Sequence, residues 1–180
     1  MRHLPPHAPT RPKTKARARL KTRPAARILI IDPDDRILLF KADDFPLDPE
    51  SRIATYWYVP GGAVEHGETF EEAARRELWE ETSIRDVEIG PCVWMREQVL
   101  EFHGIGRALA QERFFPVWVA DNSLSFANML DMEATVMTDH RWWPLDALRR
   151  TNDVVFPPDL PEHLAPILRR ELPDEPLTIR

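Results

Sequence analysis

Three glutamates in one short segment have the spacing of a metal site. Glu77, Glu80 and Glu81 stand at relative positions i, i+3 and i+4, so a helix through them brings their carboxylates onto one face. Like charges at this spacing repel one another by about 0.2 to 0.5 kcal/mol per pair, and a purely structural helix gains nothing from them. Mg²⁺ prefers carboxylate oxygens and commonly bridges a protein to substrate phosphates. The spacing therefore indicates a cation site for phosphate chemistry.

The surrounding segment resembles the Nudix box, G-x5-E-x7-R-E-U-x-E-E-x-G-U, in which U is a bulky aliphatic residue. Six of the seven fixed positions match, and the two aliphatic positions are filled as well. Ser83 is the one departure, because the family has glycine there. The residues in register with the signature are Gly62, Glu68, Arg76, Glu77, Leu78, Glu80, Glu81 and Ile84.

Ser83 falls where the helix of the box should end. A left-handed helix end costs a residue other than glycine about 1 kcal/mol or more. Two interpretations stay open: the helix ends in another way, or some stability is lost. Neither removes a carboxylate, so the substitution bears on the geometry of the loop more than on metal binding.

The helix itself is predicted by local signals. Thr69 followed by Glu72 forms a capping box, which places the helix start near Phe70. An apolar stripe suited to lie against a sheet then runs along one side, and it consists of Phe70, Ala73, Ala74 and Leu78. Residues 57–59 have strand composition, and Gly61 and Gly62 permit a tight turn before the helix. The box therefore reads as strand, loop and helix.

The rest of the chain predicts further strands and helices. One hairpin is expected from strands at residues 27–31 and 36–41, and another from strands at 93–102 and 107–119, with His103 in its turn. Trp142 and Trp143 point to opposite faces if that segment is extended, and packing is the favoured role for both. Short helices are expected at residues 145–150 and 158–172. The second of these covers either the sheet or a partner, and a homodimer is left open.

Composition favours one globular domain over residues 25–180. The chain has 180 residues and 43% hydrophobic content, enough for one sizeable core. Cys92 is the single cysteine, which excludes an intramolecular disulfide and favours a reducing, cytoplasmic location. No apolar run approaches the roughly 20 residues that span a bilayer, so no membrane association is expected.

The first 24 residues form a separate, basic segment. Of the 24 Lys and Arg residues, eight lie in residues 1–24, which hold no Asp or Glu, so this tail carries a charge of +8 and the remainder −14. Five prolines disfavour a helix, and we expect a disordered tail. Weak contact with a polyanion such as nucleic acid is one function for it. A solvated extension, or one lying against the acidic body, is the other interpretation.

The resemblance implies an α/β (α+β) fold, an α/β/α sandwich around a mixed β-sheet, and metal-dependent hydrolysis of a pyrophosphate bond by water attack on phosphorus. By the same resemblance Glu77, Glu80 and Glu81 hold Mg²⁺ or Mn²⁺, while Glu68 and Arg76 brace the loop and helix. Glu80 is the first candidate for the general base. Acids outside the box that are candidates for base or extra metal ligand are Glu97, Glu112, Glu133 and Asp139.

The implied substrate is a nucleoside diphosphate linked to another group, and its identity stays open. Dinucleoside polyphosphates, ADP-ribose or nucleotide sugars, and oxidised nucleoside triphosphates all fit the box. A competing hypothesis is a Nudix-fold module that has lost catalysis and binds nucleotides or regulates. The complete set of three box glutamates argues against it, because no structural need preserves a repulsive cluster.

Overall fold

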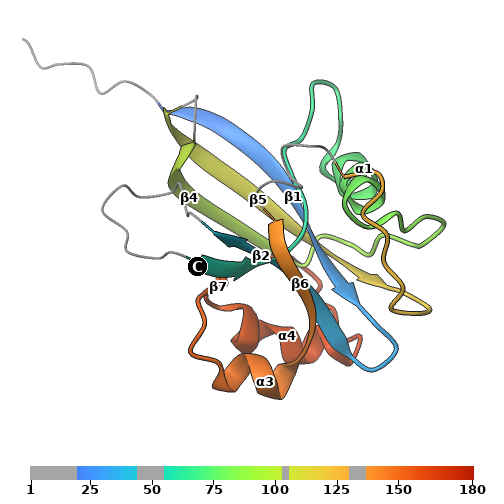
Figure 1. Cartoon of the computed structure of the whole chain (residues 1–180). Helices are drawn as coiled ribbons and strands as arrows, with labels where there is room; N and C mark the ends of the chain where they lie inside the picture. The colour runs from blue at the N-terminus through green and yellow to red at the C-terminus, as the bar shows by residue number, and fades with distance from the viewer. Residues whose placement is uncertain (1–19, 44–54, 103–105, 130–136) are drawn as a thin grey trace, which may run out of the picture.

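A computed structural model describes residues 20–43, 55–102, 106–129 and 137–180 of the chain. Its eight strands form one mixed sheet in the order β7-β3-β2-β1-β5-β4-β8, with β6 paired to β2 (Figure 1). The strands are β1 (Lys21–Ile31), β2 (Arg36–Asp43), β3 (Thr55–Tyr58), β4 (Trp94–Phe102), β5 (Gly106–Trp118), β6 (Met137–Pro144), β7 (Val155–Phe156) and β8 (Leu177–Thr178). The helices within the described residues are α1 (Phe70–Thr82), α3 (Leu145–Arg150) and α4 (Leu160–Leu168). None of the helices described is long and apolar enough to cross a membrane.

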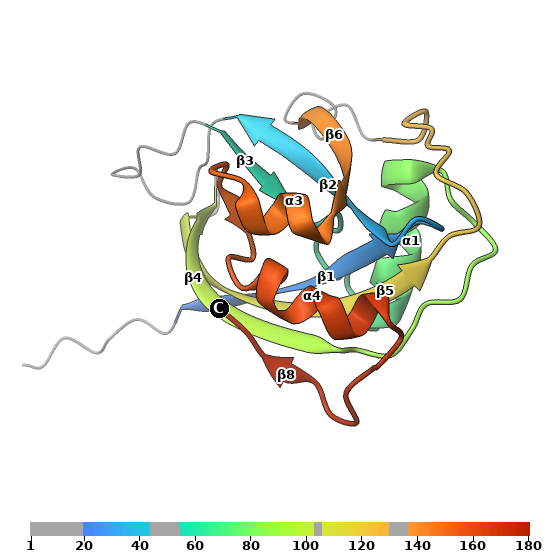
Figure 2. The ribbon, with the colours of Figure 1, turned by 90° about the horizontal axis from the view of Figure 1, so that it is seen from below.

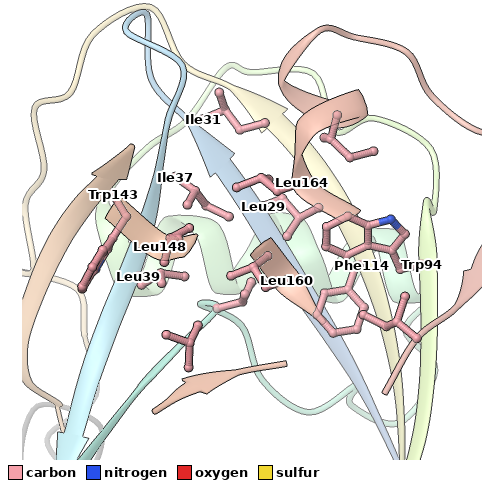
Figure 3. Close-up of a cluster of buried hydrophobic side chains, with 14 of the residues drawn as sticks. Leu29, Ile31, Ile37, Leu39, Trp94, Phe114, Trp143, Leu148, Leu160 and Leu164 are labelled. Carbon is pink, nitrogen blue, oxygen red and sulfur yellow. The ribbon is translucent and has the colours of Figure 1, made fainter. Parts of the chain in front are cut away.

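Helices cover both faces of the curled sheet, which confirms the expected α/β/α layering (Figures 1 and 2). On one face, Ala73, Ala74 and Leu78 of α1 pack in a core with residues of β1, β2 and β5. On the other face, Leu148 of α3 and Leu160 and Leu164 of α4 form a second core (Figure 3). The side chains of this second core that Figure 3 labels are Leu29, Ile31, Ile37, Leu39, Trp94, Phe114, Trp143, Leu148, Leu160 and Leu164.

Strand β1 lies between the two cores and runs parallel to β5 along its whole length. Ile28 and Ile30 face α1, whereas Leu29 and Ile31 face α3 and α4, because successive side chains of a strand point to opposite faces. A strand buried on both faces needs a nearly continuous apolar run, and the sequence Ile28 to Ile31 supplies it. The central strand thereby fixes α1 on one side of the sheet.

Several expected elements are confirmed. The second hairpin pairs Trp94 with Phe114 and continues to Phe102 opposite Gly106, and His103 lies outside the described residues. Turn residues 32–35 join β1 to β2 as expected, although the two strands pair only at Ile31 and Ile37. Trp143 is buried at 3% exposure, and Trp142 is partly buried against the core under α1.

Two boundaries differ from the sequence expectation. Lys21 to Pro24, assigned to the basic tail 1–24, belong to β1, because they pair in parallel with Ala108 to Gln111 of β5. This pairing spans more than 80 residues of sequence and leaves no local signal. The C-terminal helix, expected over 158–172, is α4 and ends at Leu168. Residues 1–19 lie outside the described part of the chain.

Candidate active site

The glycine loop before α1 lies directly beside β1. The backbone N–H of Ala26 donates to the Gly62 carbonyl at 2.9 Å, and that of Ile28 donates to the Pro60 carbonyl at 2.9 Å. Gly61 has a φ of +125°, and a Cβ there would stand 2.2 Å from the Ala26 carbonyl oxygen. Only glycine fits at this position, since both the left-handed φ and the close backbone approach exclude a side chain. The loop is therefore held against the central strand.

Helix α1 begins as the sequence predicts. Thr69 is its N-cap, its hydroxyl accepts from the Glu72 N–H at 3.2 Å, and the Glu72 carboxylate accepts from the Thr69 N–H at 2.7 Å. This capping box satisfies two backbone donors at once and fixes where the helix starts. The start in turn fixes which positions point back toward the glycine loop.

Arg76 connects the loop to the carboxylates of α1. Its Nε and Nη2 donate to the two oxygens of Glu68 at 2.8 and 3.0 Å. Nη2 also donates to the Ala63 carbonyl at 2.8 Å, and Nη1 donates to Glu77 Oε1 at 2.8 Å and to Glu80 Oε2 at 3.0 Å. A planar guanidinium with five donors can serve all these partners at once. Arg76 thereby joins Ala63 and Glu68, which precede the helix, to Glu77 and Glu80 on it.

This network shifts the pKa values of its two central members. The hydrogen bond from Arg76 holds the pKa of Glu68 below its ordinary value. The hydrogen bond to Glu68, and further ones to Glu77 and Glu80, raise the pKa of Arg76, although burial acts in the opposite direction. Arg76 and Glu68 thus carry opposite charges at neutral pH, and their pairing offsets part of the repulsion among the box glutamates.

Glu77 lies flat against the glycine loop. A Cβ on Gly62 would stand 2.3 Å from Glu77 Oε1 and 2.7 Å from Oε2, so the absence of a side chain at Gly62 makes room for this carboxylate. The Glu77 side chain is 5% exposed, whereas that of Glu80 is 19% exposed. The two carboxylates therefore share Arg76 but differ in their access to solvent.

Glu81 is the third carboxylate and is tied to the same loop. Its Oε2 accepts from the Gly61 N–H at 2.7 Å, and the residue is 4% exposed. The structure thus brings together all five residues predicted for the site, Glu68, Arg76, Glu77, Glu80 and Glu81, around residues 61–63 of the loop.

The donor set fits a divalent cation of the hard kind. Among the described residues, no three His, Cys, Asp or Glu side chains form a group that could hold a metal ion in this arrangement. Arg76 Nη1 lies between Glu77 and Glu80 and donates a hydrogen bond to each of them. Arg76 engages one oxygen of each of these two glutamates. Glu77, Glu80 and Glu81 offer only carboxylate oxygens, and these are the donors that Mg²⁺ and Mn²⁺ prefer.

Helix α1 ends at Ser83 in the left-handed conformation. Ser83 has a φ of 60° and a ψ of 12°, and its N–H donates to the Trp79 carbonyl at 2.9 Å. Its hydroxyl donates to the Ser125 carbonyl at 2.9 Å and accepts from Asn128 Nδ2 at 2.8 Å. The helix therefore keeps the geometry that a glycine would give, and two side-chain hydrogen bonds offset part of the strain.

A buried polar cluster beside the loop was only partly foreseen. Glu112 on β5 is 4% exposed and accepts from Arg27 Nε on β1 at 2.8 Å, while Arg96 Nε on β4 lies 3.5 Å from its second oxygen. The sequence predicts Glu112 only as a candidate base or extra metal ligand, and Arg27 only as the first residue of a strand. The parallel pairing of β1 with β5 brings the two together, and an arginine inside an apolar strand pattern is the one local signal that could have indicated it.

The other acids named outside the box have no contact with it in the described residues. Glu97 accepts from Gln111 Nε2 at 2.7 Å on the exposed hairpin of β4 and β5. Asp139 is exposed on β6 and accepts from the His140 N–H at 2.8 Å. Glu133 lies outside the described residues. The structure thus groups the box residues with one another and leaves Glu97 and Asp139 elsewhere.

Comparison with known proteins gives a family match over most of the chain. The sequence profile described as NUDIX domain matches residues 21–167. The chain is 26% identical over 143 residues to an RNA pyrophosphohydrolase of Caulobacter vibrioides, an alignment covering 75% of this chain and 77% of that protein. It is 42% identical over 57 residues to a Bacillus subtilis protein described as a candidate 8-oxo-dGTP diphosphatase, covering 32% of each chain.

Solved structures share the fold. A MutT protein from Methanosarcina mazei matches with a TM-score of 0.57 at 21% identity, over 84% of this chain and 96% of that one. The ORF135 protein of E. coli matches with a TM-score of 0.56 at 23% identity, over 87% and 96% of the two chains. At this level of identity the likeness concerns the arrangement of sheet and helices.

Proposed function

This chain belongs to the Nudix family of pyrophosphohydrolases, and we propose that it hydrolyses the pyrophosphate bond of a nucleoside diphosphate linked to another group. The observation that carries the proposal is the joint placement of Glu77, Glu80 and Glu81 by Arg76 and the Gly61 to Gly62 loop. A helix that served packing alone would gain nothing from three carboxylates held so close together.

In this proposal Glu77, Glu80 and Glu81 hold Mg²⁺ or Mn²⁺. The cation, when bound, neutralises phosphate charge and acidifies water. The chain's own contribution is position: the loop fixes Glu81 through the Gly61 N–H, the bare face of Gly62 admits Glu77, and Arg76 aligns Glu77 with Glu80. Arg76 and Glu68 are bracing residues, which act through the carboxylates they hold.

Glu80 is the proposed general base. Its side chain is 19% exposed, against 5% for Glu77, so water can approach it more readily. Only one of its oxygens is engaged by Arg76, which leaves the carboxylate able to accept a proton from water at its second oxygen. Water then adds to one phosphorus, the bridging oxygen leaves with the other phosphoryl group, and Glu80 holds the proton. No covalent intermediate with the protein is required.

The substrate is proposed at the level of its class. The relatives are named as an RNA pyrophosphohydrolase and as a candidate 8-oxo-dGTP diphosphatase, which supports a nucleotide as the common element. The box carries the phosphate chemistry, and the residues around it select the attached groups. The basic residues of the segment 1–24 add a polyanion contact to the proposal, with RNA as one such polyanion.

A substrate panel tests the proposal. Dinucleoside polyphosphates, ADP-ribose, nucleotide sugars, nucleoside triphosphates and a 5′-triphosphorylated RNA would be incubated with the full chain in Mg²⁺ or Mn²⁺, and nucleotide and phosphate release would be followed. We expect release from at least one class, dependent on the cation and lost in Glu80→Gln and Glu81→Gln. Release that is the same in these variants would refute the assignment of the carboxylates, and no release from any class would refute the reaction.

A further inference from the structure

We propose that Arg27 and Glu112 are positioning residues for Glu81, acting through the peptide of Gly61. This inference rests on the proposed function, because it assigns Glu81 to the cation. Neither residue belongs to the box, and they come from two strands that are neighbours only in the folded chain. The contacts run from Glu112 to Arg27, from Arg27 to Gly61, and from Gly61 to Glu81.

The planar guanidinium of Arg27 donates hydrogen bonds to two partners that lie in different directions. Its Nε donates to Glu112 Oε1 at 2.8 Å, and its Nη1 donates to the Gly61 carbonyl at 2.8 Å. A guanidinium is rigid, so fixing one edge on a buried carboxylate fixes the direction of the other donors. Glu112 is 4% exposed and has little freedom of its own. The Gly61 carbonyl is therefore held by a group whose orientation the sheet determines.

Gly61 transmits this orientation to Glu81. Its carbonyl is held by Arg27, and its N–H donates to Glu81 Oε2 at 2.7 Å. Gly61 lies at a φ of +125°, and a Cβ there would stand 2.2 Å from the Ala26 carbonyl oxygen, so this part of the loop lies close against the backbone of β1. Without the hydrogen bond from Arg27, the Gly61 peptide is held less firmly. The direction of the Gly61 N–H, which donates to Glu81, then becomes less defined.

The charges in this chain of contacts support a persistent arrangement. Burial disfavours the charged guanidinium of Arg27, yet the charge and hydrogen bond of Glu112, and the charge of Glu81, raise the pKa of Arg27 above its ordinary value. Arg96, the second arginine near Glu112, makes an ion-pair contact at 3.5 Å with the other carboxylate oxygen and has no described contact with Gly61. Arg96 is thus buried in the same cluster but has no described contact with the glycine loop.

Positioning and long-range electrostatics predict opposite results for one substitution. Arg27→Gln removes a positive charge near the cation site, which by Coulomb attraction alone would tighten cation binding. Loss of positioning would weaken it. Glu112→Gln removes a negative charge, so in this variant the loss of Coulomb attraction and the loss of positioning both weaken cation binding. The direction of the Arg27→Gln effect therefore separates the two explanations.

The test is a titration of the full-length protein with Mn²⁺, followed by electron paramagnetic resonance of the unbound ion, which requires no substrate or turnover. We expect the dissociation constant for Mn²⁺ to rise by about 10-fold in Arg27→Gln and in Glu112→Gln, the lower end of the usual loss when a residue that orients a metal ligand is removed. The double variant should bind no more weakly than either single variant, because both break the same chain of contacts.

Two further variants separate the positioning by Arg27 from the effects of its charge and of its burial. Arg27→Lys retains the charge but not the fork, and we expect it to weaken binding as Arg27→Gln does. Arg96→Gln is the matched control, a buried arginine lost beside the same glutamate, and we expect no weakening. Thermal unfolding of each variant identifies any that does not fold.

The outcomes separate this inference from the function on which it rests. Unchanged or tighter binding in a folded Arg27→Gln or Arg27→Lys protein would overturn the positioning role and leave the proposed function standing. Equal weakening in Arg96→Gln would also overturn it, because the effect would then come from the buried cluster in general. A wild-type protein that binds Mn²⁺ no better than Glu81→Gln would overturn the proposed metal site itself, and this inference with it.

Discussion

Nδ2 of Asn128 donates a 2.8 Å hydrogen bond to the hydroxyl of Ser83, at the residue where α1 ends in the left-handed conformation. The same hydroxyl donates to the Ser125 carbonyl at 2.9 Å. The segment after β5 is thereby attached to the end of the helix that carries the three glutamates. A serine with these partners takes the place that glycine has in the Nudix box.

Substitution of Ser83 should separate strain from hydrogen bonding. Ser83→Ala loses both hydroxyl contacts and keeps the left-handed strain, and we expect the free energy of unfolding to fall by about 1 to 2 kcal/mol. Ser83→Gly loses the same contacts but relieves the strain, so it should be more stable than Ser83→Ala by roughly 1 kcal/mol. Urea unfolding measures both. Equal stabilities of the two variants would contradict the strained cap.

Gly62 should be essential for the position of Glu77. In Gly62→Ala the new Cβ would meet the Glu77 carboxylate at 2.3 to 2.7 Å, and the carboxylate has to move away from the loop. We expect Mn²⁺ binding to weaken by at least about 10-fold while the protein remains folded.

Gly67→Ala is the control for the Gly62 variant. Gly67 has a φ of +91° with open space around its α-carbon, so an alanine there is strained but displaces nothing. It should lower the free energy of unfolding by about 1 kcal/mol without changing the affinity for Mn²⁺. If both alanine variants bind Mn²⁺ like the wild type, the close packing of Glu77 on Gly62 has no role in cation binding.

The Glu68 pairing predicts a direction for stability against pH. The hydrogen bond from Arg76 lowers the pKa of Glu68 from its ordinary value of 4.5, so this pairing contributes its full stability above pH 4.5. The contribution is lost as the pH falls from 4.5 through the lower pKa of the folded state. Urea unfolding at a series of pH values should therefore show a shallower acid decline for Glu68→Gln than for the wild type. Parallel declines would contradict the pairing.

The parts of the fold that could be predicted from sequence are those with local causes. The capping box of Thr69 and Glu72 lies within four residues, and the structure confirms the start of α1 at Phe70. The spacing of Glu77, Glu80 and Glu81 is likewise a property of one helix. The antiparallel pairing of β4 with β5 was predictable because the two strands are close together in the sequence.

What could not be predicted depends on contacts between distant residues. Arg27 and Glu112 are 85 residues apart and meet only because β1 pairs in parallel with β5. The same pairing places Lys21 in the sheet, although the sequence around Lys21 predicts a basic tail. Asn128 stands 45 residues after Ser83, so the partners that stabilise the left-handed cap leave no pattern near it. The box thus identifies the carboxylates together with Arg76 and Glu68, whereas the contacts of Arg27 and Asn128 depend on how distant segments pack together.

The most direct test of the proposed active site is cation-dependent turnover of the wild type, Glu80→Gln and Glu71→Gln on the best substrate of the panel. Glu71 is an exposed glutamate in the first turn of the same helix, so the two variants make the same chemical change on α1. We expect kcat to fall by about 100-fold or more in Glu80→Gln, in the range of a lost general base, and not to change in Glu71→Gln. Equal turnover in all three proteins would contradict it.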